Sequence, residues 1–172
     1  MGGQVRRDDH GEADGPPSAG RRSSPSRHGG SVPPRGSPRS GPRLIVLDAS
    51  AYCEALLRLP DDPLRARLGA VDVAHVPDGF DIEVLNVLGR LCSAGRISAS
   101  EGAAELLALM AATDLRRHSV MPLLPDMWRL RHNVTGYDAA YVALAARLDL
   151  PLVTADQRLA QAPNLTCAVE AF

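Results

Sequence analysis

The chain has few of the features that stabilise secreted or membrane-bound proteins. Its three cysteines, Cys53, Cys92 and Cys167, are an odd number without CxxC spacing, which argues against a disulfide framework and a zinc clip. No stretch approaches the ~20 apolar residues of a membrane span, and the N-terminal segment lacks the apolar run of a signal peptide. We therefore expect a cytoplasmic protein with no membrane association, in which the cysteines are small buried side chains.

Lysine is absent altogether, and all 19 basic residues are arginines. Leucine, isoleucine and phenylalanine are also absent from residues 1–43, which are rich in Gly, Pro, Ser and Arg. Such a composition cannot bury enough apolar surface to offset the entropy lost on ordering. We expect residues 1–43 to be a disordered, positively charged tail, with eight Arg against four acids. Residues 44–172 carry eleven Arg against sixteen acids and predict one globular domain.

Apolar runs and helix-period patterns alternate from Leu44 onward, which predicts an α/β domain with a mainly parallel sheet. The expected strands cover 44–48, 72–76, 115–120, 151–155 and 165–169. The expected helices cover 50–59, 63–70, 79–94, 99–113, 123–132, 136–148 and 156–161. Ser50 is the expected N-cap of the first helix, and Ser98 or Ser100 is the expected cap of the fourth.

Two aspartates stand where expected strands end. Asp48 follows the apolar run Leu44–Leu47, and Asp156 follows the run Leu152–Ala155. Because ligands in open α/β sheets collect at the carboxyl ends of the strands, we expect both carboxylates at one edge of the sheet.

Two further carboxylates lie on the apolar faces of expected helices. Glu83 stands three residues after Phe80 and four before Val87, and Asp138 stands three residues before Tyr141. An unpaired acid is costly to bury, and neighbouring acids repel one another unless a cation holds them. Ligation by carboxylate oxygens favours Mg²⁺ or Mn²⁺ over zinc. The pattern therefore predicts a metal site suited to phosphodiester hydrolysis.

Each of these acids also has a structural explanation when it is taken alone. Asp48 and Asp156 could be turn or helix-cap residues. Asp138 could interact with the positive end of its helix, and Glu83 could be solvated at a helix edge. The joint placement of the four acids favours a shared metal site over four separate structural roles.

Four segments of the chain resemble the PIN domain and, within that family, the VapC-type toxins of bacterial toxin–antitoxin pairs. These segments are Leu44–Ser50, Glu83–Asn86, Thr135–Ala145 and Leu152–Leu159. They extend over nearly the whole expected domain. The last two together are specific, whereas an apolar strand that ends in Asp is a weak signal by itself.

The resemblance implies a three-layer α/β/α sandwich for residues 44–172. It also implies a metal-dependent endoribonuclease that acts as a toxin and leaves 5′-phosphate ends on the cleaved RNA. The implied site residues are Asp48, Glu83, Asp138 and Asp156 as ligands of Mg²⁺ or Mn²⁺, with Thr135 and Ser50 as supporting hydroxyls. The implied partners are an RNA substrate, a cognate antitoxin and a second copy of the chain in a homodimer.

Other classes of protein explain the residues less well. Receiver domains and haloacid-dehalogenase-type phosphatases also gather acids around Mg²⁺, but they use a lysine, which this chain lacks. Metal-free cleavage would need a pair of histidines, yet His75, His118 and His132 share no motif. Two alternatives stay open: a PIN-domain nuclease of RNA processing, and a catalytically silent PIN-fold binding module.

Arginines offer candidates for contacts to RNA phosphates. In the expected domain these candidates are Arg116, Arg117, Arg129 and Arg131. The arginines of residues 1–43 could also contact nucleic acid, although a solvated linker is the preferred interpretation of that segment.

We predict that the tail is dispensable for folding and for activity. A chain that starts at Pro42 should keep its thermal midpoint and its rate of RNA cleavage, because the removed residues offer almost no apolar surface to pack. Thermal unfolding followed by circular dichroism, with a cleavage assay in parallel, checks this. A loss of several degrees would show instead that the tail packs against the domain.

Overall fold

The structure is a computed structural model that describes residues 43–172. The prediction of a disordered tail therefore lies outside the described residues, apart from Arg43. Arg43 precedes the first strand, and its backbone N–H donates a hydrogen bond of 2.6 Å to Asp72. None of the helices within residues 43–172 has the length and hydropathy that a bilayer crossing requires.

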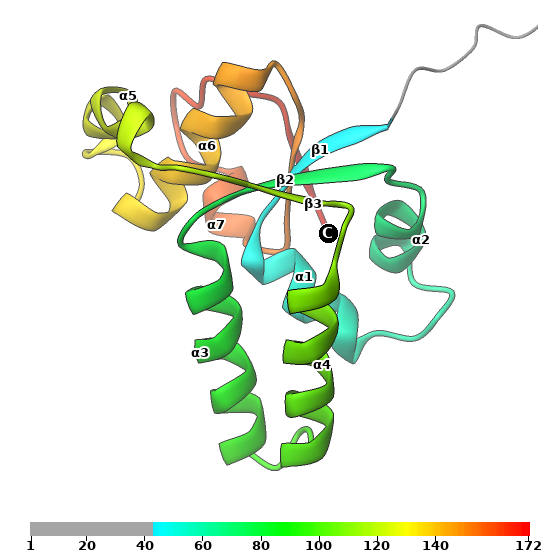
Figure 1. The fold of residues 1–172 in the computed structure, drawn as a ribbon. Helices are drawn as coiled ribbons and strands as arrows, with labels where there is room; N and C mark the ends of the chain where they lie inside the picture. The colour runs from blue at the N-terminus through cyan, green and yellow to red at the C-terminus, as the bar shows by residue number, and fades with distance from the viewer. Residues whose placement is uncertain (1–42) are drawn as a thin grey trace, which may run out of the picture. The chain divides into compact units, whose positions relative to one another are not determined.

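Five strands form one sheet in the order β3-β2-β1-β4-β5, and all four pairings are parallel (Figure 1). The strands are β1 (Leu44–Leu47), β2 (Val73–Pro77), β3 (Leu115–His118), β4 (Leu152–Thr154) and β5 (Val169–Ala171). The central strand β1 pairs on both sides, with Val46 opposite His75 on one side and Leu152 on the other. This position explains its continuous apolar sequence, since a strand covered on both faces needs apolar side chains on both.

Within residues 43–172, seven α-helices and one 3-10 helix connect the strands (Figure 1). They are α1 (Ala49–Leu57), α2 (Pro63–Gly69), α3 (Phe80–Ser93), α4 (Ala99–Ala111), η1 (Met121–Leu123), α5 (Leu124–Leu130), α6 (Gly136–Leu148) and α7 (Gln157–Ala160). The chain crosses the sheet in one direction from β1 to β3 and then returns to β4 on the far side of β1. Because such crossovers are right-handed, α1–α4 lie on one side of the sheet and α5 and α6 on the other; α1 packs against β4, and α6 packs against β1, β2 and β4. The three-layer α/β/α arrangement is confirmed.

Helix α6 is buried nearly all the way round, which is why its sequence has little amphipathic character. Every residue from Ala139 to Ala145 is buried, and the helix packs against β1, β2 and β4. Its alanines allow the close approach to the sheet that larger side chains would prevent. A helix so enclosed is a firm support for Asp138 in its first turn and for Tyr141 one turn later.

Three local predictions need correction. The N-cap of α1 is Asp48 and not Ser50, because the Asp48 carboxylate accepts the backbone N–H of Ser50. The last strand covers Val169–Ala171 and not 165–169, since a turn at Asn164, with φ of 57°, delays the extended segment. The helix expected over 123–132 is divided into η1 and α5. The capping box at Ser98 is confirmed, with bonds in both directions between Ser98 and Glu101.

Candidate active site

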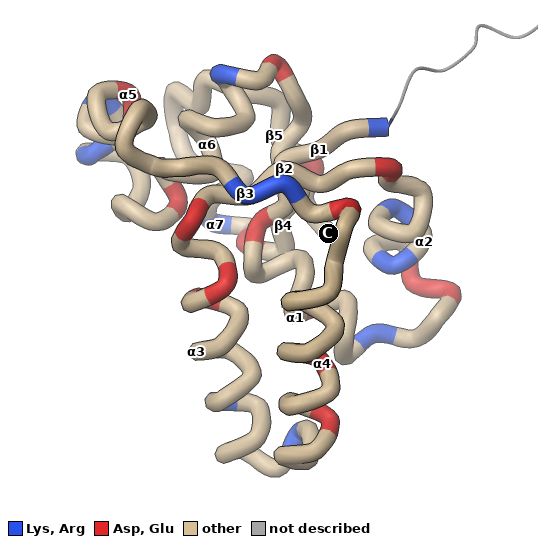
Figure 2. The backbone as a smooth tube through the Cα atoms, in the orientation of Figure 1, with Lys and Arg blue, Asp and Glu red and all other residues tan. Residues whose placement is uncertain are grey.

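The candidate site lies at the carboxyl ends of β1 and β4, which are neighbours in the sheet. Asp48 directly follows β1, and its backbone N–H donates a 3.0 Å bond to Val153 O in β4. After β1 the chain turns toward β2, whereas after β4 it turns toward β5, on the opposite side. Such a reversal of direction opens a crevice at the strand ends, where ligands of α/β proteins bind. Figure 2 also shows acidic segments at the start of α3.

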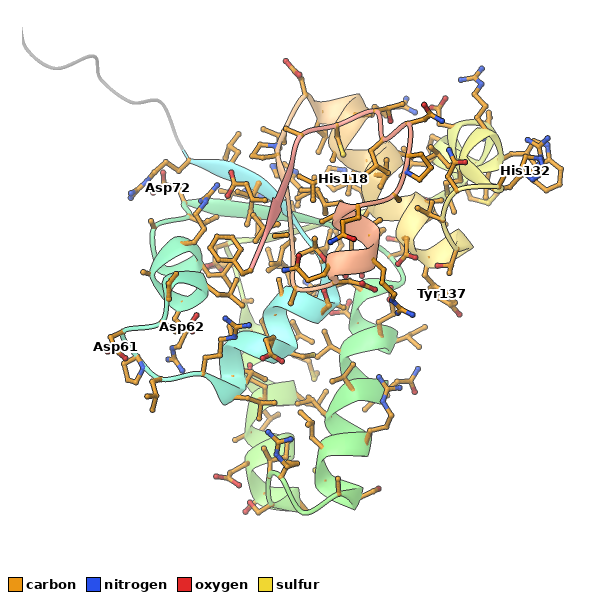
Figure 3. The ribbon with its side chains drawn as sticks, turned by 180° about the vertical axis from the view of Figure 1, so that it is seen from behind. Asp61, Asp62, Asp72, His118, His132 and Tyr137 are labelled. Carbon is orange, nitrogen blue, oxygen red and sulfur yellow. The ribbon has the colours of Figure 1, made fainter. Side chains whose placement is uncertain are left out.

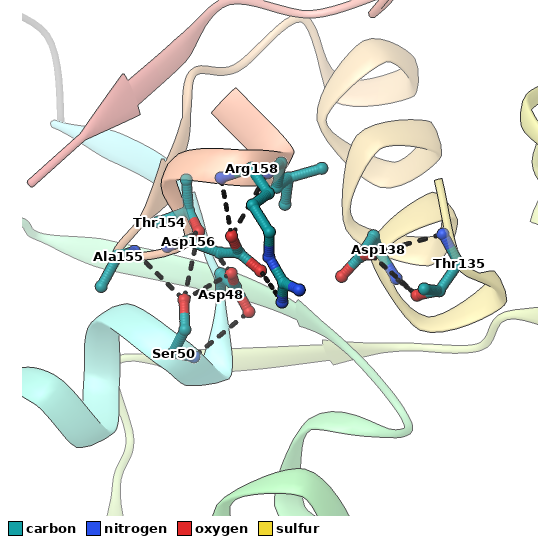
Figure 4. Close-up of polar contacts among 9 residues, drawn as sticks. Asp48, Ser50, Thr135, Asp138, Thr154, Ala155, Asp156 and Arg158 are labelled. Atoms are coloured by element: carbon teal, nitrogen blue, oxygen red, sulfur yellow. Dashed lines mark hydrogen bonds and ion pairs between the residues drawn. The ribbon is translucent and has the colours of Figure 1, made fainter. Parts of the chain in front are cut away.

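Asp48 is almost fully buried, at 6% exposure, and hydroxyl groups surround its carboxylate. Its Oδ2 accepts hydrogen bonds from Ser50 Oγ at 2.6 Å and from Thr154 Oγ1 at 2.5 Å, while its Oδ1 accepts the Ser50 N–H at 3.2 Å. The two hydroxyl oxygens in turn accept the backbone N–H groups of Ala155 and Asp156 (Figure 4). These bonds hold the Asp48 carboxylate in one orientation between the two strand ends.

Asp138 occupies the third position of α6 in a capping box with Thr135. Thr135 Oγ1 donates to Asp138 Oδ2 at 2.8 Å and accepts the Asp138 N–H at 3.2 Å. Asp138 therefore does have the structural role considered for it, at the start of its helix, and its oxygen Oδ2 performs that role. Among residues 43–172, no side chain or backbone group donates a hydrogen bond to the other oxygen, Oδ1. The Thr135–Asp138 pair is separate from the Asp48 network in Figure 4.

Glu83 lies in the first turn of α3, and its side chain is half-buried. Its Oε1 accepts a hydrogen bond of 2.8 Å from the hydroxyl of Tyr141 in α6. Burial raises the pKa of Glu83 above its ordinary value, the bond from Tyr141 lowers it, and the negative charges of Asp48 and Asp138 raise it further. The sequence-based expectation that Glu83 points inward, and not into solvent, is confirmed.

Three of the four acids interact electrostatically. Burial raises the pKa of Asp48, the hydrogen bonds from Ser50 and Thr154 oppose that rise, and the charge of Asp138 adds to it. In the described part of the chain, no arginine forms an ion pair with these three acids. The arrangement therefore places like charges near one another without a protein cation to balance them.

Asp156 differs from the other three acids because it has a cationic partner. Its Oδ1 caps α7 by accepting the Arg158 N–H at 2.8 Å, and its Oδ2 pairs with the Arg158 guanidinium at 3.3 Å. Burial alone would raise the pKa of Asp156, but the hydrogen bonds from Arg158 and Leu159 lower it below its usual value. Asp156 is therefore negatively charged, and the guanidinium of Arg158 balances that charge. The same carboxylate caps α7.

The donors fit a hard divalent cation in their chemistry. All are carboxylate oxygens, and the like-charge interaction among Asp48, Glu83 and Asp138 is the kind that a bound cation relieves. Within residues 43–172, however, no three acidic, histidine or cysteine side chains are close enough to enclose a metal ion as they are placed. The residues therefore supply the right ligands without being drawn together into a coordination sphere.

A hollow of about 390 Å³ adjoins two of the four acids. Asp138 and Asp156 line it, together with Thr135 and the two arginines Arg131 and Arg158. Acids and arginines on one wall are suited to a ligand that carries phosphates, since the arginines can contact phosphate oxygens. Arg131 is thus the one sequence-predicted phosphate contact that this hollow includes.

The other predicted phosphate contacts are engaged or lie elsewhere. Arg117 forms two bonds to Asp81 at the start of α3, at 2.6 and 2.8 Å, and Arg129 pairs with Asp126 on α5. Arg116 lies beside Arg117 on β3, which is not part of the hollow. The prediction that these three arginines contact the substrate is therefore not supported by their positions.

Two of the histidines form a pair that the sequence does not show. His75 Nδ1 lies 2.8 Å from His118 Nε2, and the two rings stack with their centroids 5.0 Å apart. His132 is far from His118 in Figure 3. Neither member of the pair lines the hollow beside the acids, so the pair is not placed to act as acid and base there.

Two residues of the site escaped sequence reasoning. Thr154 is fully buried and holds Asp48, and Arg158 pairs with Asp156. A hydroxyl residue inside the fourth expected strand was the available signal for Thr154, because a buried hydroxyl needs a hydrogen-bond partner. For Arg158 the signal was its spacing of two residues from Asp156, within reach of a helix-capping carboxylate.

Known proteins are similar to this chain over most of its length. The PIN domain matches residues 45–165. Ribonuclease VapC1 of Mycobacterium tuberculosis is 40% identical over 126 residues, which cover 73% of this chain and 95% of the relative. Ribonuclease VapC3 of the same organism is 41% identical over 132 residues, covering 74% of this chain and 93% of the relative.

Solved structures share the fold at lower identity. VapC20 of M. tuberculosis, described as a sarcin–ricin-loop-cleaving toxin, superposes with a TM-score of 0.51 at 21% identity, over 68% of this chain and 93% of that one. VapBC2 of Rickettsia felis, solved with a DNA fragment of its promoter, gives a TM-score of 0.54 at 12% identity, over 75% and 98%. With a PIN-domain match over most of the chain and VapC relatives at about 40% identity, the chain belongs to the PIN-domain family, among its VapC members.

Proposed function

We propose that the chain is an endoribonuclease that depends on Mg²⁺ or Mn²⁺ and acts as the toxin of a toxin–antitoxin pair. One observation carries the proposal: Asp48, Glu83 and Asp138 come from three separate elements, and, in addition to burial, the charge of Asp138 raises the pKa of both Asp48 and Glu83. The ribonuclease names of the VapC relatives support the same activity.

Asp48, Glu83 and Asp138 would hold the metal ion, and Asp156 would contribute directly or through water. When bound, Mg²⁺ or Mn²⁺ would supply an activated water and stabilise the negative charge that develops on the phosphoryl group. The neutralisation of Asp156 by Arg158 supports its more peripheral role. In this assignment the main ligands are the three of the four acids that form no ion pair with an arginine of residues 43–172.

The other residues of the site would orient the ligands and the RNA. The hydroxyls of Ser50 and Thr154 fix Asp48, and Thr135 holds one oxygen of Asp138 so that the other remains available. Arg131 and Arg158, on the wall of the hollow, would contact phosphates on either side of the cleaved bond. Water attack with departure of the 3′ oxygen would leave a 5′-phosphate on the product.

A cognate antitoxin would block this crevice with a basic side chain. The ion pair between Arg158 and Asp156 supports this, because it shows that a guanidinium fits beside a carboxylate of the site. An arginine from a partner could pair in the same way with the remaining acids and take the place of the metal ion.

We propose that the active species is a homodimer.

We predict that removing one charge stabilises the metal-free protein at neutral pH. The folded-state pKa of Glu83 is raised, so its ionisation opposes folding: this group favours the fold below its ordinary pKa and loses that contribution as the pH rises through the raised value. Glu83→Gln should therefore melt about 2 °C above wild type at pH 7 in EDTA and equal it in mild acid.

Glu54→Gln is the matched control, because Glu54 is not one of the candidate ligands and pairs with Arg58. That variant should not be more stable than wild type at pH 7. Thermal unfolding by calorimetry across this pH range measures both variants. A Glu83→Gln protein that is less stable than wild type at pH 7 would contradict the electrostatic argument.

We further predict that Asp48→Ala, Glu83→Ala and Asp138→Ala each reduce RNA cleavage to background in the presence of Mn²⁺, because each removes a metal ligand. Cleavage of a labelled single-stranded RNA measures the rate. Asp126→Ala is the control and should keep the wild-type rate, since Asp126 pairs with Arg129 away from the crevice. Normal rates in the three site variants would show that the ligand assignment is wrong, whereas a wild type that does not cleave RNA would favour a silent binding module.

Expression of the chain alone should stop growth of the host cell, and co-expression with the antitoxin encoded by a neighbouring small gene should restore it. Asp48→Ala should be harmless and should still bind the antitoxin, because it removes a ligand without changing the outer surface. Growth curves and co-purification measure these effects. Harmless expression of soluble wild-type protein, without a stable complex, would leave a nuclease of RNA processing as the better assignment.

A further inference from the structure

Tyr141 joins two of the helices that carry candidate ligands. It is among the largest fully buried side chains of the described residues, with 1% exposure. Its hydroxyl donates a hydrogen bond of 2.8 Å to Oε1 of Glu83, across the gap from α6 to α3. A buried tyrosine hydroxyl needs a polar partner, and a carboxylate gives a charge-assisted bond that is stronger than one between neutral groups.

We infer that Tyr141 is a positioning residue that holds Glu83 in the orientation needed to bind the metal ion. The inference rests on the proposed function and adds a residue to it. Tyr141 stands three residues after Asp138 on α6, so the two side chains share one face of that helix. The bond from Tyr141 therefore ties Glu83 to the same rigid helix that carries Asp138, and it leaves Oε2 of Glu83 for a ligand.

The hydroxyl of Tyr141 remains a donor over the whole neutral range. Burial raises the pKa of Tyr141 above its ordinary value, and the negative charges of Glu83 and Asp48 raise it further. Because the side chain is fully buried, it cannot touch RNA, and any effect on cleavage must pass through its neighbours. The burial of Tyr141 therefore distinguishes a positioning role from a direct contact with the substrate.

The chain contains a second bond of the same type, which serves as a control. Tyr52 in α1 is half-buried and donates a hydrogen bond to Glu105 in α4, so this bond also joins a tyrosine to a glutamate on another helix. Neither residue has a role in the proposed site. If Tyr141 mattered only as a brace between helices, removing the hydroxyl of Tyr52 would have a comparable effect.

The experiment compares the full-length wild type with Tyr141→Phe and Tyr52→Phe. The dissociation constant for Mn²⁺ is measured by electron paramagnetic resonance of the free ion, without RNA. Loss of a group that orients a metal ligand weakens metal binding by about 10–100-fold, and we expect this for Tyr141→Phe. Tyr52→Phe should stay within about two-fold of wild type, since its bond does not reach a ligand.

Cleavage kinetics give a second readout. For Tyr141→Phe, the Mn²⁺ concentration needed for half-maximal rate should rise by the same factor as the dissociation constant. The KM for RNA at saturating Mn²⁺ should not change, because Tyr141 does not contact RNA. Raising the Mn²⁺ concentration should restore much of the lost rate, which a substrate-binding defect would not allow.

Two unnatural side chains at position 141 separate the donor from the volume that it fills. 4-Aminophenylalanine keeps a donor at the ring para position and should restore Mn²⁺ affinity. 4-Fluorophenylalanine fills similar space without a donor and should lose affinity as Tyr141→Phe does. If Tyr141→Phe leaves a cavity and folds poorly, these two variants still test the inference, because both fill the space of the hydroxyl.

The inference is overturned if Tyr141→Phe binds Mn²⁺ within two-fold of wild type, or if Tyr52→Phe loses as much affinity. Failure of the proposed function has a different signature. In that case the wild type itself binds no Mn²⁺, and Glu83→Ala changes neither binding nor cleavage; both proposals are then overturned together.

Discussion

Burial of negative charge at the carboxyl ends of β1 and β4 is the constraint on which the site depends. Asp48 is 6% exposed and lacks an ion-pair partner among residues 43–172, so its charge is supported by hydroxyl and N–H donors alone. Burial and neighbouring carboxylates raise the pKa of Asp48 and of Glu83. A site that concentrates charge in this way gives up some stability of the metal-free fold and gains affinity for cations.

The scaffold satisfies this constraint with residues that also perform ordinary structural tasks. Asp48, Asp138 and Asp156 each stand at a helix start, where Asp48 and Asp156 act as N-caps and Asp138 completes a capping box. Helix capping and metal ligation need the same group, a carboxylate held at a helix N-terminus. The two interpretations are compatible for Asp138, because Oδ2 completes the capping box while Oδ1 accepts no hydrogen bond within residues 43–172.

The arginines of the domain differ in whether they border the hollow beside Asp138 and Asp156. Arg117 and Arg129 are neutralised by acids of their own surroundings, whereas Arg131 and Arg158 line the hollow beside Asp138. The chain has no lysine, and within residues 43–172 these two guanidinium groups border the same hollow as Asp138 and Asp156. Arg158 has two roles in this scheme, because the group that neutralises Asp156 also borders the space proposed for RNA.

Sequence patterns alone determined the α/β class and the helix and strand order, and they predicted that the four acids form one group. Two local patterns carried these predictions: the apolar runs that end at Asp48 and Asp156, and the helical spacing around Glu83. Both follow from the local repeat of the backbone, which can be recognised in the sequence. Tertiary structure decided the rest. Thr154 binds Asp48 from 106 residues away, and His75 meets His118 through strand register. Such partners depend on how distant elements pack, and no local periodicity encodes that packing.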